Sequence, residues 1–410
     1  MNSPKESNPI SNIKVLISIF SVCCSIFLFT IGQGATNPIL PLLVQNLGYT
    51  AAIAGFAVGI FGAGRFITNL PSGILAQKIG RKPILIIGPL IASIGYFLTG
   101  YFDSIQLILL ARLITGFGGG MHFVGASIYL RDMSNLNNRG RILSLQTISI
   151  LIGQTIGPII GGYIGELYGF TSPFIFASIS LVIAIILIIT TVIEPSHIKQ
   201  SLKQTNDSKT QKKNLGIFQL LYLFIKSGLL PIGLMTMSQF FHRSGGRFTI
   251  APLLIQNKGL TASNIGGFFS VTSLAQLTAA SMSGYIVDKL GRKTLLIPGT
   301  SIILLGLFLF DNANSYPMIL LVAVLLGIGE GSLTSSTVTL FADNAPKGYE
   351  GVTMGLYRTF GDFGFMIGPP ILGFIIQQMN FSSALLVDGI LISVCTLAVM
   401  IFAKETKKRT

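Results

Sequence analysis

Ionisable side chains inside long apolar runs are the residues of this sequence most able to do chemistry. Arg358 and Asp362 are four positions apart, which places both on one face of a helix, where they can form an ion pair. Glu330 and His242 stand in two other apolar runs. A charge in an apolar interior is costly, so it normally faces a cavity and has partners. We expect Glu330 or Asp362 to carry a proton. The alternatives are a static Arg358–Asp362 bridge that fixes helix geometry and a hydrogen-bonded cavity role for His242.

Arginine outnumbers acid in these runs. The acids expected in the site are Glu330 and Asp362, and the arginines are Arg65, Arg112, Arg243, Arg247 and Arg358. A guanidinium group offers two parallel donors to a carboxylate or phosphate, so an organic anion is one class of ligand that fits this balance. Asp388 in the last apolar run and Glu166 near the end of another are expected to lie outside the site.

Sequence signatures of enzymes, metal sites and nucleotide cofactors are missing. The three histidines (His122, His197 and His242) are far apart, and there is no Ser/His/Asp arrangement, no phosphate-binding P-loop and no cluster of metal ligands. We therefore expect a protein that is not an enzyme and that uses neither a metal nor a cofactor. Ion gradients are then the expected source of energy.

The composition places these residues in a membrane. Half of the 410 residues are hydrophobic and 10% are charged, whereas a soluble domain has about 25% charged residues. The mean hydropathy is +0.71. Cys23, Cys24 and Cys395 lie in apolar runs, which excludes a disulfide-stapled secreted scaffold.

Twelve runs are long enough to cross a bilayer, which takes about 20 apolar residues each. They are 14–36, 51–78, 84–101, 105–130, 141–167, 171–193, 222–254, 262–288, 294–310, 317–342, 350–378 and 383–403. The predicted fold class is therefore an all-α membrane protein with twelve transmembrane helices. Lys and Arg gather in one set of connections, whereas the opposite set (42–50, 102–104, 168–170, 255–261, 311–316 and 379–382) holds only Lys258. This bias predicts that both termini are cytoplasmic, and it explains most of the +14 charge without nucleic-acid binding.

The chain contains the same sequence twice, at a constant offset of 211 positions. Pro41-Leu42-Leu43 matches Pro252-Leu253-Leu254, and Gly80-Arg81-Lys82 matches Gly291-Arg292-Lys293. We predict an N-terminal six-helix half (1–193), a cytoplasmic linker (194–215) and a C-terminal six-helix half (216–410). The lysines of the linker are expected to lie at anionic lipid rather than in a binding site. Two parallel halves can rock about a site at the membrane midplane and open it to each side in turn.

The repeated loops GILAQKIGRKP (Gly73 to Pro83) and GYIVDKLGRKT (Gly284 to Thr294) resemble the loop signature of the major facilitator superfamily. The resemblance covers almost the whole chain and implies two pseudo-symmetric six-helix bundles that operate by alternating access. It assigns gating roles to Gly73, Gln77, Gly80, Arg81, Gly284, Asp288, Gly291 and Arg292. Asp288 is implied to latch onto a helix N-terminus of the opposite half, where a carboxylate is favoured. Because Gln77 has no charge, we predict an asymmetric gate that depends on Asp288; the alternative is a charged loop that only fixes topology.

Two further motifs point to one branch of that family. GQTIGPIIGG contributes Gly153, Gly157, Pro158 and Gly162, and it is similar to the helix-bend signature of the drug/proton antiporters. This similarity implies a bias toward export. The partial repeat GFMIGPPILG (Gly364 to Gly373) leaves simple helix packing as the alternative. ARLITGFGGG (Ala111 to Gly120) resembles an element in which the arginine, here Arg112, serves proton transfer; the alternative is an arginine whose head reaches the lipid headgroups.

These observations predict a multi-pass cell-membrane protein that works as a secondary active transporter. Proton-coupled efflux of small amphipathic compounds, of the multidrug type, is the favoured function. The alternatives are a proton- or ion-coupled carrier of an organic anion or other small metabolite, and a transporter-like sensor that binds without transport. The expected partners are a small-molecule substrate, protons and the lipid bilayer, with no nucleic acid, and the expected assembly is a monomer.

Overall fold

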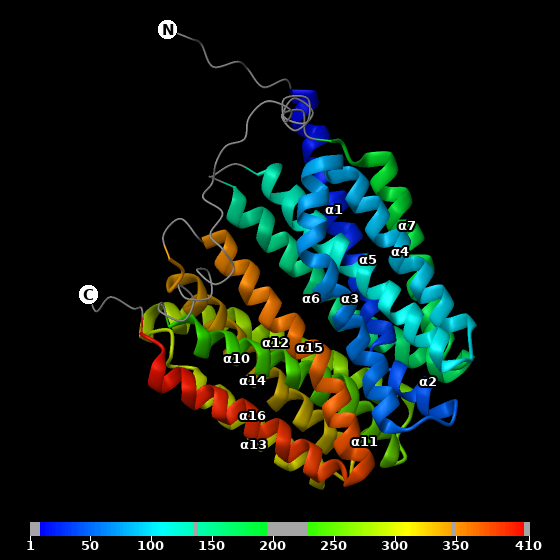
Figure 1. Ribbon diagram of the computed structural model, residues 1–410, viewed down its shortest axis with the longest axis vertical. Coiled ribbons are helices and arrows are strands. Elements are labelled where there is room, and N and C mark those ends of the chain that lie inside the picture. Colours follow the sequence, from blue (N-terminus) through cyan, green and yellow to red (C-terminus); the bar gives the residue numbers. More distant parts are fainter. Residues whose placement is uncertain (1–8, 135–137, 195–227, 347–349, 406–410) are drawn as a thin grey trace.

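The computed structural model describes residues 9–134, 138–194, 228–346 and 350–405, and every regular element in these ranges is a helix (Figure 1). The first group of helices comprises α1 (Pro9–Thr36), α2 (Leu40–Asn46), α3 (Ala51–Ile79), α4 (Arg81–Tyr101), α5 (Ile105–Asp132), α6 (Arg139–Tyr168) and α7 (Ser172–Thr191). The second group comprises α10 (Leu229–Phe241), η1 (His242–Ile250), α11 (Ala251–Asn257), α12 (Ala262–Leu290), α13 (Leu296–Asn312), α14 (Tyr316–Asp343), α15 (Glu350–Gln378) and α16 (Phe381–Phe402). The all-α prediction is confirmed.

Most predicted spans coincide with these helices to within a few residues. One predicted connection and one predicted span differ from the structure. The connection expected at 42–50 is largely the short helix α2, which starts beside Pro41 and buries Leu42 and Leu43. The run predicted at 222–254 continues without a break through α10, η1 and α11 to Asn257, while its residues 222–227 lie outside the described residues. Apolar runs that continue past a proline were thus cut too early. The predicted linker and its lysines, 195–215, also lie outside the described residues.

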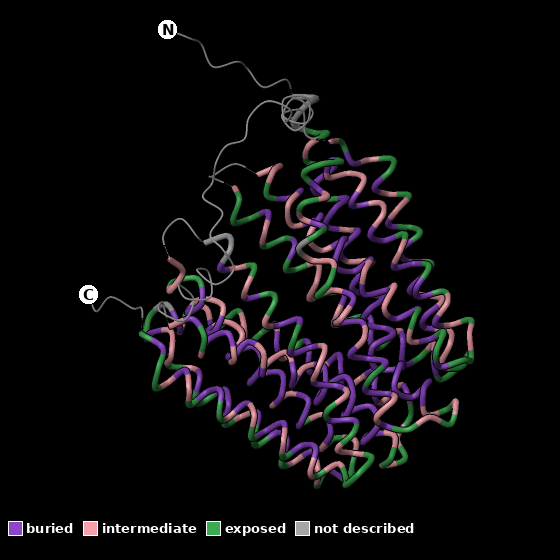
Figure 2. Tube along the Cα trace, viewed as in Figure 1, coloured by how far each residue is buried: buried purple, intermediate pink, exposed green. Residues whose placement is uncertain are grey.

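The two groups of helices each form a packed bundle. The helices α1 and α3 to α7 pack mainly on one another, and so do α10 to α16 (Figure 1). Between the bundles, α3 packs on α15 and α6 packs on α12. Buried residues follow the lines where helices meet, and exposed residues lie on the outer helix faces (Figure 2).

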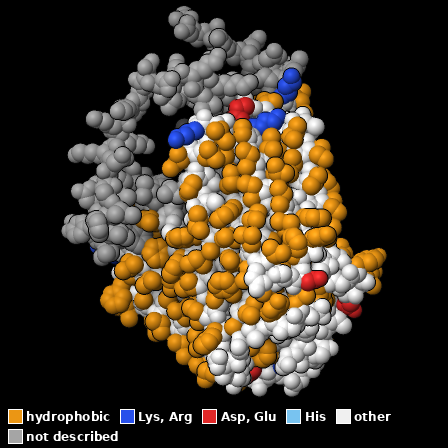
Figure 3. All heavy atoms as spheres, turned by 45° about the vertical axis from the view of Figure 1, so that its right-hand side comes forward, with side chains coloured by type: hydrophobic (Ala, Val, Ile, Leu, Met, Phe, Trp, Pro, Cys, Tyr) orange, Lys and Arg blue, Asp and Glu red, His pale blue; other side chains and the backbone are white. Residues whose placement is uncertain are grey.

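The outer surface of the bundles is apolar. Phe308, Ile401 and Phe402 are each more than two-thirds exposed, and hydrophobic side chains cover most of the face in Figure 3. Nine helical segments of the described residues are long and apolar enough to cross a bilayer, and Leu296–Asn312 is a shorter apolar helix. A surface of this kind is stable in lipid rather than in water, so the chain is a multi-pass membrane protein.

Glycines hold the bundles together at one end. A Cβ on Gly55 of α3 would overlap the carbonyl oxygen of Pro369 on α15, and a Cβ on Gly266 of α12 would overlap that of Pro158 on α6. Each contact is the other shifted by 211 positions, with the partners exchanged between bundles. The sequence repeat is therefore also a pseudo-twofold relation in space.

The same four helices separate toward their other end. Gly73 on α3, Gly140 on α6, Gly284 on α12 and Gly355 on α15 have no atom within 4 Å of an added Cβ, other than those of their own neighbouring chain. We call this end, which carries the loops at residues 80 and 291, the basic face, and the end with the loops at residues 48 and 259 the opposite face. The bundles are closed at the opposite face and diverge toward the basic face.

Candidate functional site

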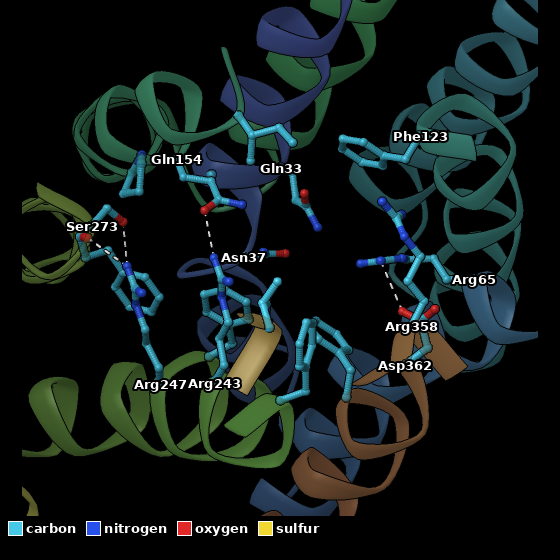
Figure 4. A pocket seen from close by; sticks show the side chains of 18 of the residues that line it. Gln33, Asn37, Arg65, Phe123, Gln154, Arg243, Arg247, Ser273, Arg358 and Asp362 are labelled. Atoms are coloured by element: carbon cyan, nitrogen blue, oxygen red, sulfur yellow. Dashed lines mark hydrogen bonds and ion pairs between the residues drawn. The ribbon is translucent and has the colours of Figure 1, made fainter. Parts of the chain in front are cut away.

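A cavity of about 400 Å³ lies between the two bundles (Figure 4), within the range typical of small-molecule sites. Both bundles contribute side chains to it. The polar part of its wall comprises Gln33, Asn37, Arg65, Gln146, Gln154, Arg243, Arg247, Ser273, Tyr357, Arg358 and Asp362, and the aromatic part comprises Phe123, Phe240, Phe248, Phe269 and Phe365. Such a wall combines apolar contact area with hydrogen-bond donors and acceptors.

Asp362 is bound to the other bundle rather than to its own helix. Its Oδ1 lies 3.0 Å from Nη2 of Arg65, and its Oδ2 accepts a hydrogen bond from the Asn69 amide. The ion pair expected between Arg358 and Asp362 is therefore not formed, and the hypothesis of a static bridge within this helix is wrong. The reason is that α3 lies against α15 at this level, so partners on α3 occupy both carboxylate oxygens. Arg358, one turn nearer the basic face, is exposed.

Arg243 also links the bundles. Its Nη2 donates a hydrogen bond of 2.7 Å to Oε1 of Gln154 on α6 (Figure 4). Among the described residues, neither Arg243 nor Arg358 has an ion-pair partner, so both bring uncompensated positive charge to the cavity wall. Asp362 in the same wall is already neutralised by Arg65.

Arg247 lies between the cavity and a charged group deeper in the second bundle. Its Nη1 is 3.1 Å from Oε2 of Glu330, and its Nη2 donates to Oγ of Ser273 at 2.5 Å and to the carbonyl of Phe269 at 3.1 Å. Its guanidinium also stacks 5.5 Å from the centre of the Phe269 ring. These contacts hold Arg247 rigidly and leave one face of it toward the cavity.

His242 joins two acids from two other helices. Its Nδ1 lies 2.6 Å from Oδ2 of Asp388 on α16, and its Nε2 lies 3.7 Å from Oε1 of Glu330 on α14. The expectation that Asp388 lies outside the site is wrong, because this residue is 1% exposed and directly bonded to His242. A signal for it existed in the sequence: like the other charges of the site, Asp388 breaks the repeat, since Ala177 stands 211 positions before it.

Arg112 lies inside the first bundle, away from the cavity wall. It is 1% exposed, and its guanidinium stacks 5.1 Å from the centre of the Phe61 ring and 5.9 Å from that of Tyr96. The alternative of an arginine whose head reaches the lipid headgroups is therefore wrong. No acid among the described residues forms an ion pair with Arg112, and its role in proton transfer stays a prediction.

The two repeated loops at the basic face carry matching ion-pair networks. Arg81 pairs with Asp132, and its backbone N–H donates to Glu194, at 2.9 and 2.7 Å. Arg292 pairs with Asp343, and its N–H donates to Glu405, both at 2.9 Å. None of these four acids was expected from the sequence to have a role, although the offset of 211 relates them in pairs.

These networks depend on the loop glycines. Gly80 and Gly291 have φ angles of 98° and 119°, which favour glycine and turn the chain between the helices.

Partial burial lowers the pKa of Lys293 beside the second network. Gln77 is exposed, and Gly73 and Gly284 lie on the separated helix segments. The side chain of Asp288 is outside the described part of the chain, so the predicted latch stays a prediction.

The helix-bend motif lies where three helices meet. A Cβ on Gly153 or Gly157 would overlap α1, at Thr30 and Ile31 respectively, and one on Gly162 would lie 2.5 Å from the carbonyl of Ala262 on α12. Gly373 makes the equivalent contact with Ala51. Helix packing therefore accounts for the repeated positions of the motif, and a bias toward export stays a prediction.

Among the described residues, no group of His, Cys, Asp and Glu is arranged to hold a metal ion.

A membrane protein with two pseudo-symmetric helical bundles around a polar cavity has the architecture of a small-molecule carrier. The family model of the Major Facilitator Superfamily matches residues 22–244 and 232–410. The chain belongs to this superfamily and is a transporter of that type.

Named relatives agree with this assignment. The chain is 24% identical to Multidrug resistance protein 1 of Bacillus subtilis, with 92% of this chain and 96% of the relative covered. It is 25% identical to Quinolone resistance protein NorA of Staphylococcus aureus, with 87% and 89% covered. Among solved structures, a D-xylose-proton symporter superposes with a TM-score of 0.75 at 17% identity, covering 97% of this chain and 99% of the symporter. The last likeness concerns the fold alone.

Proposed function

We propose that the protein is a proton-coupled exporter of small amphipathic compounds, of the multidrug type, that works by alternating access. The observation that supports this most directly is a cavity whose wall is built by both bundles, in a molecule whose bundles diverge toward one face. Residues 1–193 and 216–410 form the two moving halves in this proposal, and 194–215 connect them. The protein works as a monomer, since one chain supplies the complete cavity.

The chemistry of the cavity wall fits this substrate class. Five phenylalanines offer apolar and stacking contacts, while Gln33, Asn37 and Gln154 offer polar groups that accept different ligands. The relatives named for resistance to drugs and quinolones support export. We place the protein in the cytoplasmic membrane with the basic face toward the cytoplasm. The described state is then the inward-facing one, ready to receive a substrate from the cell.

Proton coupling requires an acid that exchanges its partner during the cycle. Asp362 is paired across the bundles with Arg65, and Glu330 is paired within one bundle with Arg247. Separating the bundles at this level would remove the partners of Asp362, and an unpaired buried carboxylate is strongly disfavoured unless it takes up a proton. Movement of the halves and protonation of Asp362 are therefore linked in this mechanism.

A second candidate function is a carrier of an organic anion. The free charges of Arg243 and Arg358 in the cavity wall favour it, because a carboxylate or phosphate group can bind between donors of this kind. A quinolone carries a carboxyl group and an amphipathic ring system, so it satisfies both candidates. The two functions differ in whether a permanently cationic compound is carried.

The test is transport by the purified protein in proteoliposomes. We expect an imposed proton gradient to drive a quinolone and the cation ethidium against their concentration gradients, and a protonophore to abolish both fluxes. Transport of the quinolone alone supports the anion carrier. Binding of either compound without any flux contradicts both functions and favours a sensor.

A further inference from the structure

Three titratable side chains meet behind the wall of the cavity, inside the second bundle. His242 stands at the start of η1, Glu330 in the middle of α14 and Asp388 on α16, and they are 1%, 6% and 1% exposed. His242 is the central member, since one ring nitrogen faces each acid. The proposed mechanism gives Asp388 no role, yet a buried carboxylate is retained only at a cost in stability.

The backbone around His242 makes room for Asp388. A Cβ on Gly246 would lie 2.5 Å from Oδ2 of Asp388 and 3.0 Å from Nδ1 of His242, so any other residue there would displace this contact. Gly246 belongs to the π-helical segment η1, whose wider turns are frequent at functional sites. The corresponding position of the first bundle is Ala35, which faces Gly161 instead. In the first bundle, α7 meets α1 through Ala177 at Gly32 instead, so the contact at Gly246 is specific to the second bundle, although both bundles bring this last helix close.

A small second cavity lies between His242 and Glu330. It has a volume of about 60 Å³, and its wall includes both residues together with Gln239, Gln276 and Tyr357. Nε2 of His242 and Oε1 of Glu330 have no hydrogen-bond partner among the described residues, although both are buried. The volume suffices for one or two water molecules, so a proton can cross the 3.7 Å gap through water or after a small approach of the two groups.

The charges of this group balance when it holds one proton. Arg247 and a protonated His242 supply two positive charges, and Glu330 and Asp388 supply two negative charges. Arg243 is the other charged group near Glu330, while α15 presents the neutral phenol of Tyr357. Removing the proton would leave Asp388, whose described contact is with His242, as a buried carboxylate without a cationic partner, which is costly.

We infer that Asp388, His242 and Glu330 form one proton-binding unit, in which Asp388 is a positioning residue that holds and orients the imidazolium of His242. This inference rests on the proposed function, because it adds to Asp362, at the interface of the bundles, a second site for the coupled proton inside one bundle. Arg247 connects the unit to the substrate, since it both pairs with Glu330 and lines the large cavity.

The transfer step follows from these contacts. When a substrate draws Arg247 away from Glu330, the proton on Nε2 of His242 moves to Oε1 of Glu330. The imidazole and the Glu330 carboxyl are then both neutral, and Asp388 stays ionised and hydrogen-bonded to Nδ1–H. From Glu330 the proton is released when Arg247 returns, and His242 takes up the next proton.

The experiment compares three variants of the full chain. Asp388→Asn removes the charge, Asp388→Glu restores it, and Thr396→Val is the matched control. Thr396 is also buried on α16, eight positions after Asp388, and its hydroxyl lies 2.7 Å from that of Thr300. The first readout is the ¹⁵N spectrum of His242 in purified, histidine-labelled protein at pH 7, with His122 and His197 assigned by replacement with Gln. The second is transport of ethidium and a quinolone, measured both as gradient-driven flux and as gradient-free exchange.

We expect an imidazolium signal from His242 in the wild type, Asp388→Glu and Thr396→Val, and a neutral ring in Asp388→Asn. Gradient-driven flux should fall by roughly tenfold or more in Asp388→Asn, while exchange is retained, because only proton binding is lost. A neutral His242 in the wild type, or an imidazolium that persists in Asp388→Asn, overturns the inference. If the spectra are as expected but the wild type carries neither compound, the proposed function fails and the proton-binding unit stands.

Discussion

Arg65 and Asp362 form a 3.0 Å ion pair at the level where α3 and α15 separate. Toward the opposite face, Gly55 and Gly59 contact Pro369 and Met366 across the bundles. Toward the basic face, an added Cβ on Gly73 or Gly355 meets nothing. The pair thus stands at the vertex of the cavity, where it connects the closed part of the interface to the open part.

Replacement of either member of this pair should impair the cycle. In Arg65→Gln, Asp362 would be left buried with only Asn69, and breaking a buried pair costs about 3 to 5 kcal/mol; the partial exposure of Arg65 puts the expected loss at the lower end of that range. We expect Arg65→Gln and Asp362→Asn each to lower gradient-driven flux, and the double variant to be no worse than the single ones. Fluxes of all four proteins form a double-mutant cycle, and strictly additive losses would mean that the two residues are not coupled.

The free arginines of the wall should set the preference for charge. We expect Arg358→Gln to weaken quinolone binding by about tenfold, since a hydrogen bond to a charged group contributes about 1.5 to 3 kcal/mol and this site is partly solvated. Ethidium binding should stay unchanged or improve. Equilibrium binding of both compounds to purified protein is the measurement, and Arg131→Gln is the control because Arg131 is exposed at the end of α5. An equal loss of binding affinity for both compounds would contradict the prediction that Arg358 recognises charge.

Bulk at the glycine contacts should prevent closure of the opposite face. A side chain in Gly55→Val would meet the backbone of α15, so we expect the equilibrium to shift toward a state that is open at that face. The control is Gly73→Ala on the same helix, where the added methyl group meets no neighbour. In cells, a cysteine introduced at Asn37 in the cavity wall should react several times faster with an impermeant thiol reagent in Gly55→Val. Unchanged reactivity would show that α3 and α15 adapt to the side chain.

Much of the architecture could be predicted from the sequence because it depends on patterns within single segments. The spans follow from apolar length, and the matching loops and glycine contacts follow from the constant offset. Residues that break the repeat, such as Glu330, His242 and Arg247, were correctly expected to have partners, and the structure brings all three together. These expectations depend only on the residues of single apolar runs and on the repeat, so they do not require the packing of the bundles to be known.

The partners themselves could not be predicted, because they are chosen by contacts between helices. Helical spacing allowed Arg358 to pair with Asp362, but it carries no information on α3, which supplies Arg65 and Asn69. The position of Asp388 in the last apolar run predicts a place outside the site, yet Gly246 lets α16 come close enough for Asp388 to bond with His242. Both errors arise from tertiary packing, which a single sequence does not show.

The loop networks should differ in their effect on stability. Glu194 accepts hydrogen bonds of 2.7 Å from the backbone N–H groups of Arg81 and Lys82. Beside it, Asp132 pairs with Arg81, and the Asp132 side chain is 18% exposed. Glu405 does the same for Arg292 and Lys293 at 2.9 and 3.0 Å, but the nearby Asp343 is 34% exposed. We expect Glu194→Gln to lower the unfolding temperature in detergent by about 1 to 3 °C, and Glu405→Gln by less, because exposed charges are better screened. A larger effect of Glu405→Gln would contradict this order.

A carboxylate also bridges the bundles at the opposite face, and its removal should favour opening there. Oε2 of Glu166, near the end of α6, accepts a hydrogen bond of 3.0 Å from the backbone N–H of Ser263 in the first turn of α12. A negative charge is favoured at a helix N-terminus, so this contact stabilises the closed form of that face. The repeat supplies no second copy, because Gln377 occupies the position equivalent to Glu166. We expect Glu166→Gln to increase labelling of a cysteine at Asn37 from the opposite face, by less than Gly55→Val does, and Gln377→Glu to decrease it. If Glu166→Gln leaves the labelling rate at the wild-type value, the glycine contacts alone hold this face closed.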